Sequence, residues 1–239
     1  MTELTLYQTI HLARGRARNL AAHAALLDAA ARDIFARPYR PDLGLLAARI
    51  AAVAEAEHYP GGLSAFVRIE VTADGEERLL PAGGSLYDGY ALRSLTPDAV
   101  TADYELPLTQ APSTVRKAAA LLARQKALQA GATVAVQCDR NGMLCAADDA
   151  PLFGILGKRV LPGPAFPCIE RDLVLRALPA AGLTTGSEPL TRELLPRLDE
   201  LFYADHRGIT SLAHCDSLPL MSLLAERIAR AMEGLFSEK

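Results

Sequence analysis

The chain has 239 residues, of which 50% are hydrophobic and 22% charged, so it can bury the core of one large or two small globular domains. Its 25 basic and 28 acidic residues give a formal net charge of −3, which disfavours a strongly basic nucleic-acid-binding protein. Charged residues interrupt every Ala- and Leu-rich segment, so no membrane span is predicted, and the first residues lack a signal-peptide pattern. We therefore expect a soluble, cytoplasmic protein.

The first half of the sequence predicts strands and two helices. Asn19 and Asp42 are the expected N-caps of these helices. Asp74 and Gly75 predict a hairpin turn after a strand in which polar and apolar residues alternate. The expected elements of this half span residues 4–12, 20–35, 42–57, 63–72, 78–80, 90–94 and 101–106.

The second half opens with a predicted helix and continues mainly with strands. Asn141 and Gly142 predict a hairpin with a type I′ turn. The expected elements span residues 116–130, 133–138, 143–146, 152–156, 158–161, 168–180 and 218–236. Two prolines separate the halves, so we predict an N-terminal α+β domain over 1–106, a linker over 107–113 and a C-terminal domain over 114–239.

The four cysteines are scattered along the sequence, at Cys138, Cys145, Cys168 and Cys215. They form no CxxC pair, and no histidine lies near them at the spacing of metal ligands. Neither a disulfide framework nor a metal site is predicted, and we interpret the cysteines as reduced packing residues.

A series of short motifs carries a family resemblance. In chain order they are Tyr7-Gln8-Thr9-Ile10, Asn19-Leu20-Ala21-Ala22-His23, Ala123-Arg124-Gln125-Lys126-Ala127, Gly131, Asn141-Gly142, Leu152-Phe153-Gly154-Ile155 and Phe166-Pro167-Cys168-Ile169-Glu170-Arg171. In this order and spacing the chain resembles the class IV aminotransferases. This family has fold type IV of the pyridoxal-phosphate enzymes and includes D-amino-acid and branched-chain aminotransferases and aminodeoxychorismate lyase. The resemblance covers nearly the whole chain and implies a two-domain α+β fold like that of D-amino-acid aminotransferase.

The resemblance implies a lysine that forms a Schiff base with pyridoxal phosphate, because only an amine can make this bond. The matching position is Ser113, which cannot form it. The nearest amine belongs to Lys117, about one helical turn further on, roughly 6 Å away. Lys117 is therefore the candidate catalytic lysine, and a solvated charge at the start of a helix is its alternative interpretation.

Other cofactor contacts that the resemblance implies are also changed. The acid expected to pair with the pyridine nitrogen falls on Ala146. Asp148 or Asp149, two and three residues later, could reach inward in its place, although a charged pair beside Pro151 is typical of an exposed turn. The arginine expected at the phosphate falls on Leu26.

The resemblance also implies a phosphate cradle at a helix N-terminus. It falls on Cys168, Ile169 and Glu170, so backbone amides near Ile169 and Glu170 are the candidate phosphate contacts. The Glu170 carboxylate would lie where the phosphate is expected. A second phosphate-side segment matches residues 199–206 and lacks the expected hydroxyl donors.

A few further polar residues are candidates. Tyr7 matches an active-site tyrosine of the D-amino-acid aminotransferase branch, and its alternative interpretation is a core tyrosine. Arg68 on a strand, and His206 and Arg207 in a loop, are candidate ligand contacts or ordinary solvated cations. His23 is interpreted as a packed or hydrogen-bonded helix residue. A nucleophilic pair of Ser113 with one of the five histidines has no supporting motif.

Two functions follow from these observations. The first is a divergent pyridoxal-phosphate enzyme, an aminotransferase or a lyase, that uses Lys117. The second, which we favour, is a member that kept the fold, lost the Schiff-base lysine and the cofactor site, and binds another small ligand or acts as a non-catalytic protein. In both cases the resemblance implies a homodimer with a ligand cleft between the two domains.

Overall fold

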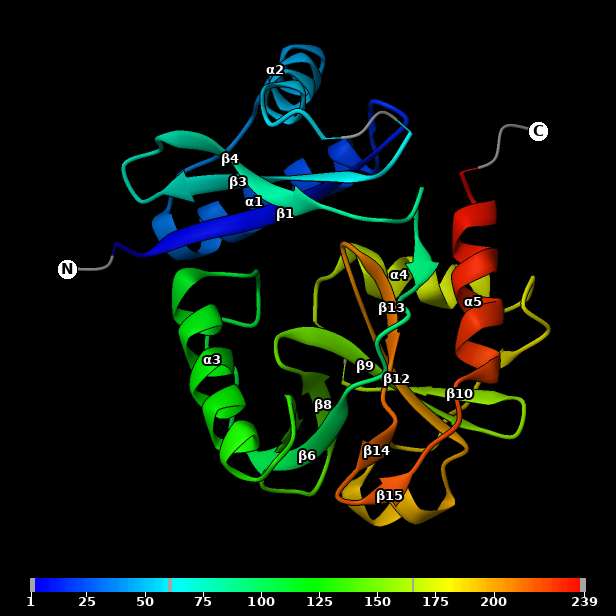
Figure 1. The fold of residues 1–239 in the computed structure, drawn as a ribbon. Helices are drawn as coiled ribbons and strands as arrows, with labels where there is room; N and C mark the ends of the chain where they lie inside the picture. Colours follow the sequence, from blue (N-terminus) through cyan, green and yellow to red (C-terminus); the bar gives the residue numbers. More distant parts are fainter. Residues whose placement is uncertain (1–2, 60–61, 165, 237–239) are drawn as a thin grey trace. The chain divides into compact units, whose positions relative to one another are not determined.

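The structure is a computed structural model that describes residues 3–59, 62–164 and 166–236 (Figure 1). The chain divides into two compact units. Unit 1 comprises Met1–Gly89 and Leu108–Val115, and unit 2 comprises Tyr90–Pro107 and Arg116–Lys239. Both contain helices packed on sheets, which confirms the predicted α+β class.

The bounds of the two units differ from those of the predicted domains. Residues 90–107 belong to unit 2 because their strands pair with strands of the second half of the chain. Residues 108–113, expected to be a linker, belong to unit 1, where Ser113 forms a bridge to Leu6 and the Pro112 carbonyl accepts a hydrogen bond from the Tyr7 N–H. Strand pairing outweighs the proline content of this segment.

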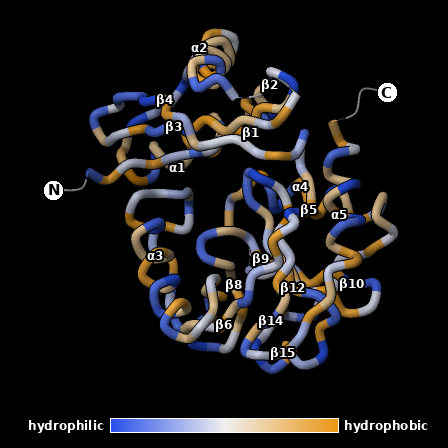
Figure 2. The backbone as a smooth tube through the Cα atoms, viewed as in Figure 1, coloured by the Kyte–Doolittle hydropathy of each residue, from blue (hydrophilic) through white to orange (hydrophobic). Residues whose placement is uncertain are grey.

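Unit 1 is a four-stranded antiparallel sheet in the order β2-β1-β3-β4, with two helices packed against it. The strands are β1 (Thr5–Ala13), β2 (Arg16–Ala17), β3 (Ala65–Thr72) and β4 (Glu77–Gly84), and the helices are α1 (Leu20–Phe35) and α2 (Leu43–Ala56). Its core forms between the helices and the alternate strand residues that face them. It includes Leu6 and Ile10 of β1 and Leu27 of α1. Figure 2 shows hydrophobic residues along most of α2.

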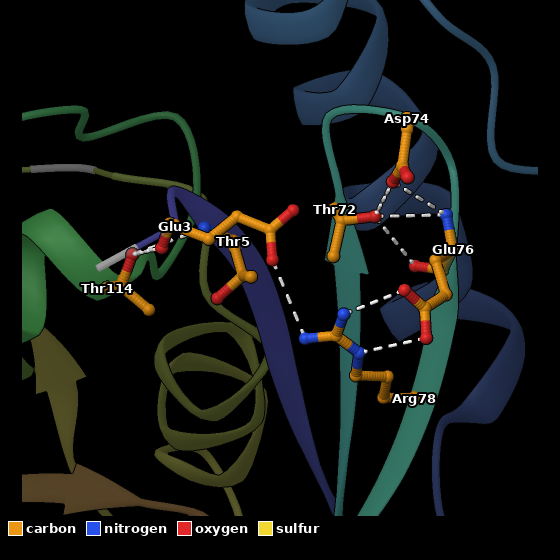
Figure 3. Close-up of polar contacts among 7 residues, drawn as sticks. All are labelled: Glu3, Thr5, Thr72, Asp74, Glu76, Arg78 and Thr114. Atoms are coloured by element: carbon orange, nitrogen blue, oxygen red, sulfur yellow. Dashed lines mark hydrogen bonds and ion pairs between the residues drawn. The ribbon is translucent and has the colours of Figure 1, made fainter. Parts of the chain in front are cut away.

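Polar contacts hold the edges of this sheet (Figure 3). The guanidinium of Arg78 on β4 contacts the carboxylate of Glu76, with Nη2 2.7 Å from Oε2, and lies 3.6 Å from that of Glu3. The Thr114 hydroxyl donates to the Glu3 carbonyl at 3.1 Å and accepts from the Thr5 N–H at 3.2 Å. These contacts join Glu3, just before β1, to Arg78 on β4 and to Thr114 in the segment that follows the bridge at Ser113.

The two predicted helix caps of unit 1 differ in outcome. The Asp42 side chain accepts a hydrogen bond from the Leu45 N–H, which confirms it as a cap. Asn19 precedes α1, but it lies in the left-handed region with φ 52° and its side chain makes no capping hydrogen bond. Asn19 therefore stands at the predicted N-cap position, but its side chain does not cap the helix, because an extended backbone is needed to aim it at the first turn.

Unit 2 is built on an 11-stranded sheet, counted over the described residues. The strand order is β15-β14-β6-β7-β8-β9-β12-β13-β5, and β10 joins β9 to β11. The strands are β5 (Ala91–Leu92), β6 (Asp98–Asp103), β7 (Val134–Cys138), β8 (Leu144–Ala147), β9 (Ala150–Leu156), β10 (Arg159–Pro162), β11 (Thr184–Thr185), β12 (Glu200–Asp205), β13 (Gly208–Ser211), β14 (His214–Cys215) and β15 (Leu218–Pro219). The helices are α3 (Thr114–Gln129), which continues from unit 1, α4 (Ile169–Ala177), α5 (Leu223–Gly234) and the 3₁₀ helix η1 (Arg192–Arg197).

The last helix begins later than predicted. Leu218 and Pro219 form β15 against β14, and α5 starts at Leu223. The carboxylate of Glu200, which is 1% exposed on β12, accepts hydrogen bonds from the N–H groups of Leu224 and Ala225 at 2.6 and 2.8 Å. This buried carboxylate satisfies first-turn amides that the local sequence leaves without a cap, so a tertiary contact sets where α5 begins.

The hairpin between β7 and β8 depends on a different turn residue than predicted. The hairpin at Asn141 and Gly142 is confirmed, but only Gly142 has a positive φ, so the turn is not type I′. Instead, the Asp139 carboxylate holds the turn by accepting hydrogen bonds from the N–H groups of Asn141 and Met143, each at 2.8 Å.

No helix of the described residues is long and apolar enough to cross a membrane.

Gly208, at the start of β13, permits the close approach of β5. Its φ is +121°, and a Cβ added there would lie 2.2 Å from the Ala91 carbonyl oxygen. We expect Gly208→Ala to lower the free energy of unfolding by roughly 2–4 kcal/mol, because backbone atoms of β5 must move and the conformation is strained. Gly157→Ala is the matched control: φ is +61° and nothing lies within 4 Å of the added Cβ, so about 1 kcal/mol is expected. Urea unfolding measures both variants, and equal losses would contradict the importance of the β5 contact.

Candidate functional site

The structure separates the two positions considered for the Schiff-base lysine. Ser113 lies in unit 1 and is fully buried beside β1. Lys117 lies on α3 in unit 2 and is half-buried. The buried residues of α3 are Arg116, Ala120, Ala123 and Ala127. The buried cation of this helix is therefore Arg116, the residue before Lys117. The catalytic role of Lys117 stays a prediction.

Arg116 is buried, with 1% of its surface exposed. Its Nη2 donates to the Asp149 carbonyl at 2.7 Å, and its guanidinium carbon lies 4.4 Å from the centre of the Phe166 ring. A guanidinium stacked on an aromatic face is held in one orientation by a cation–π interaction. The sequence did not single out this arginine, although its i, i+4 spacing to Ala120 and the apolar helix face that follows placed it on the buried side.

Ala146 lies at the centre of a small apolar cluster. It is fully buried on β8 together with Leu106 and Ala120, and Tyr104 and Phe166 pack against the three. Phe166 therefore contacts the cluster and also carries the Arg116 guanidinium on its ring. The position where the resemblance expects an acid is thus surrounded by apolar side chains, and both the Arg116 cation and the acids Asp148 and Asp149 lie near the cluster.

The acidic pair after Ala146 forms the turn between β8 and β9, and it is half-buried instead of exposed as expected. Asp148 has φ 52°, its N–H donates to the Ala135 carbonyl at 2.8 Å, and its carboxylate accepts the Ala135 N–H at 3.3 Å. Burial raises the pKa of Asp148 to about 6. This carboxylate is engaged with the backbone of β7, and Asp149 offers its carbonyl to Arg116.

The predicted phosphate contacts lie in the first turn of α4. Ile169 and Glu170 are both 8% exposed. Cys168, the N-cap, is extended and makes no capping hydrogen bond through its side chain, but its thiol donates to Glu170 Oε2 at 3.1 Å. Burial raises the pKa of Glu170 to about 7, and the neighbouring carboxylate of Asp205 acts in the same direction.

The turn between β12 and β13 brings further charges to this end of α4. His206 and Arg207 lie in that turn, as the sequence predicted. Arg207 Nε donates to Asp205 Oδ2 at 2.9 Å, and its backbone N–H donates to Oδ1 at 2.8 Å. Burial would raise the pKa of Asp205, but the charges of His206 and Arg207 and the hydrogen bonds from Arg207 hold it below its ordinary value. Asp205 is thus a fixed negative charge close to Glu170.

One hydroxyl on the neighbouring strand was missed by the sequence analysis. Thr210 on β13 lies directly across from Tyr203 on β12, and its Oγ1 accepts a hydrogen bond from Arg93 Nη1 at 3.3 Å. The register of a hairpin that the sequence did not predict brings these residues together. No simple spacing rule could have found them.

The candidate residues of unit 1 meet on one face of its sheet. Tyr7 and Arg68 lie on the adjacent strands β1 and β3, and the Arg68 guanidinium carbon lies 4.8 Å from the centre of the Tyr7 ring. Arg68 Nη1 is 3.7 Å from Glu70 Oε1. Arg68 Nε is buried and has no hydrogen-bond partner in the part of the chain that the structure describes. The predicted interpretation of Arg68 as a solvated cation does not fit this atom.

Two buried histidines of unit 1 have structural partners. His23 Nδ1 is hydrogen-bonded to Gln8 Oε1 at 2.8 Å, which confirms His23 as a hydrogen-bonded helix residue. His11 Nε2 is 2.7 Å from Ser64 Oγ, and this hydroxyl also accepts the Gly89 N–H at 2.8 Å. Both members of the Ser64–His11 pair are buried, so the pair joins the loop before Gly89 to the sheet and offers no accessible nucleophile.

The cysteines are all free thiols. Burial raises the pKa of each of them, to about 11 for Cys145 and about 12 for Cys215. Across the described ranges, no group of three or more His, Cys, Asp or Glu side chains gathers in a way that could hold a metal ion.

Comparison with solved structures decides the fold. The branched-chain amino acid aminotransferase of Escherichia coli superposes with a TM-score of 0.79 at 18% identity, over 98% of this chain and 85% of that one. The fold is that of the class IV aminotransferases. The branched-chain aminotransferase of Thermoproteus uzoniensis gives a TM-score of 0.78 at 15% identity, over 96% and 84% of the two chains. A protein assigned as a 4-amino-4-deoxychorismate lyase from Legionella pneumophila gives 0.73 at 15%, over 91% and 85%.

Sequence comparisons add nothing to this: no protein-family model matches the chain, and neither does any curated protein. The class IV aminotransferase fold was thus predicted from motif order and is confirmed by structure. One of the similar structures is an aminotransferase from Brucella abortus bound to the cofactor PLP, at 17% identity and a TM-score of 0.78. Pyridoxal phosphate is therefore associated with proteins of this fold.

The pKa of Glu170 predicts a pH-dependent stability. Because the folded-state pKa is raised from 4.5 to about 7, the contribution of this group to stability is fully present below pH 4.5 and is lost as the pH rises through 7. Glu170→Gln removes this loss. We expect the variant to gain about 3 kcal/mol of unfolding free energy relative to the wild-type protein between pH 4.5 and pH 8. Urea unfolding at several pH values measures the difference, and a difference that does not change with pH would contradict a buried, titrating Glu170.

Proposed function

We propose that this protein is a class IV aminotransferase-fold protein that does not use pyridoxal phosphate and instead binds a small carboxylate-bearing ligand. The observation that carries the first part is the surroundings of Ala146. The cofactor ring works as an electron sink when an acid keeps its nitrogen protonated. Here the matching residue is an alanine in an apolar cluster, and the charged group that contacts this cluster through Phe166 is the Arg116 guanidinium. A cation there disfavours a protonated ring nitrogen.

The opposite end of the expected cofactor site supports the same conclusion. A phosphate group carries up to two negative charges and is favoured by free backbone amides at a helix N-terminus. At the first turn of α4 this chain places the buried carboxyl of Glu170, with the charged Asp205 close by. This chain therefore offers no acid at Ala146 at one end and places a buried carboxyl, Glu170, at the other. Together with Ser113 and Leu26, the residues do not fit pyridoxal phosphate.

The second part of the proposal rests on Arg68. Its guanidinium is oriented by the Tyr7 ring, and its Nε is a buried donor with no partner among the described residues. Such a donor favours a ligand that brings an acceptor, and a carboxylate matches a guanidinium edge with two oxygens. A similar structure, of an aminotransferase from Mycobacterium tuberculosis, holds α-ketoglutarate and PMP. The structure of the Thermoproteus uzoniensis enzyme holds norvaline. Small carboxylates are thus the natural first probes for this chain. The homodimer that the resemblance implies stays a prediction.

The absence of cofactor use is tested by incubation with pyridoxal phosphate, removal of the unbound compound by desalting, and an absorbance spectrum. We expect no protein-bound chromophore in the wild-type protein or in Lys117→Ala, because neither the lysine position nor the two charged ends fit the cofactor. A chromophore that the wild-type protein retains and Lys117→Ala loses would contradict the proposal. It would identify Lys117 as the cofactor lysine and restore the enzyme hypothesis.

Carboxylate binding is tested with α-ketoglutarate by isothermal titration calorimetry. We expect Arg68→Gln to weaken binding by roughly tenfold or more, because it removes a charged donor to the ligand. Arg78→Gln is the matched control on the same sheet: its guanidinium is already bonded to Glu76, so binding should be unchanged. Equal affinities for the wild-type protein and Arg68→Gln, or no binding of α-ketoglutarate by the wild-type protein, would count against Arg68 as the ligand contact.

A further inference from the structure

The turn between β7 and β8 contains an asparagine followed by a glycine, Asn141 and Gly142. A side-chain amide in this setting can lose ammonia without an enzyme, because a glycine has no side chain to shield its backbone nitrogen. The Asn141 side chain is exposed, and nothing lies within 4 Å of a Cβ added at Gly142. The groups that would react are therefore accessible to water on the surface of unit 2.

The reaction needs only the chain and water. The Gly142 nitrogen, after losing its proton to a base in solution, attacks the side-chain amide carbon of Asn141. A C–N bond forms, and the amide nitrogen takes up a proton and leaves as ammonia. Water then opens the resulting cyclic imide at one of its two carbonyls. The product at position 141 is aspartate or isoaspartate, and in isoaspartate the main chain runs through Cβ.

The folded turn holds the reacting pair in an unproductive geometry. The Gly142 N–H donates to the Asp139 carbonyl at 3.0 Å, so the electron pair released on loss of this proton points at that oxygen instead of at the Asn141 amide carbon. The Asp139 carboxylate accepts the N–H groups of Asn141 and Met143, which fixes the backbone on both sides of the pair. The Arg192 N–H donates to the Gly142 carbonyl at 2.8 Å from outside the hairpin. Reaction therefore requires the turn to open.

Two acid–glycine pairs of the chain differ from this pair. In Asp74-Gly75 the carboxylate accepts hydrogen bonds from the Thr72 hydroxyl and the Glu76 N–H, which hold its pKa below the ordinary value (Figure 3). In Asp88-Gly89 the carboxylate accepts hydrogen bonds from Arg14. An ionised carboxylate resists attack by a nucleophile much more than a neutral amide does. The asparagine pair is thus the position at which this chemistry is expected first.

We propose that Asn141 is the deamidation site of this chain and that the Asp139 carboxylate sets the rate by keeping the turn closed. The rate of modification then follows the fraction of molecules in which the turn is open. Deamidation adds a second carboxyl to a turn that already holds Asp139, and isoaspartate lengthens the hairpin just before β8. This chemistry occurs at a surface turn and does not depend on the ligand of the proposed function.

Peptide mapping by mass spectrometry after incubation at pH 8 measures the reaction at each position, and chromatography separates isoaspartate from aspartate. We expect Asp139→Ala to raise the rate constant at Asn141 at least about fivefold, because the loss of two charge-assisted hydrogen bonds raises the open fraction of the turn. Glu105→Gln is the matched control. Glu105 Oε1 lies 3.7 Å from Arg140 Nε of the same turn, so this variant loses a charge but no backbone hydrogen bond, and its rate should stay within about twofold of the wild-type rate.

A second arm uses the wild-type protein. In guanidinium chloride at a concentration that unfolds the chain the turn is absent, so the rate at Asn141 should rise at least about tenfold over that of the folded protein. Asn141→Gln should abolish the reaction at this position, because glutamine would have to form a larger ring. Equal rates in the folded and unfolded protein, an Asp139→Ala rate equal to that of the wild-type protein or of Glu105→Gln, or deamidation at Asn19 before Asn141 would overturn the proposal.

Discussion

The strand β12 sets the arrangement of the C-terminal unit through the two carboxylates at its ends. Glu200 at its start receives the first amides of α5, and Asp205 at its end binds Arg207 and acts on Glu170 of α4. Between them the side chains alternate, so that Leu201 and Tyr203 enter the large core cluster of the unit. A shift of one residue in the register of β12 would move the acids and the core residues to the wrong faces at once. One strand therefore couples the packing of the sheet to the charges at two helix ends.

The backbone of this protein has the class IV aminotransferase fold, but several residues at the positions matched to cofactor contacts differ from those that the resemblance implies. The backbone retains the fold at 15–18% identity to the solved structures named above, so packing is preserved while most side chains have changed. Ala146, which the resemblance matches to an acid, lies near an Arg–Phe stack, and Glu170, which it matches to the phosphate cradle, is buried. Apolar packing and site charge depend on different residues, so likeness of fold does not by itself carry over the chemistry of a site.

The sequence predicted those parts of the molecule that depend on local patterns. The span of α1, the capping of α2 by Asp42 and the alternating strand β3 all follow from periodicity or from one side chain near its own backbone. Motif order predicted the fold. The hairpin of β12 and β13 and the late start of α5 were missed, because the first is fixed by pairing with β9 and β5 and the second by Glu200, 24 residues away from its partner Leu224.

The same limit applies to the candidate site. Sequence matching placed Glu170 and Tyr7 at positions of interest, but it gave no sign that Arg116 stacks on Phe166 or that Arg68 lies over Tyr7. Both contacts join residues from different elements, and their partners are separated by 50 and 61 positions in the chain. Burial also changed the meaning of a residue: Glu170 reads as an ordinary first-turn acid in the sequence and is a desolvated carboxyl in the structure. Such changes depend on what covers a side chain, and a linear pattern does not contain this information.

The four thiols have a consequence for the covalent stability of the protein. All are free, and burial raises each pKa above its ordinary value, so the thiolate that reacts with oxidants and disulfides is scarce at neutral pH. The Cys138 and Cys145 thiols donate to backbone carbonyls and the Cys168 thiol donates to Glu170, and these contacts favour the protonated form. The thiols should therefore react slowly with oxidants and disulfides at neutral pH.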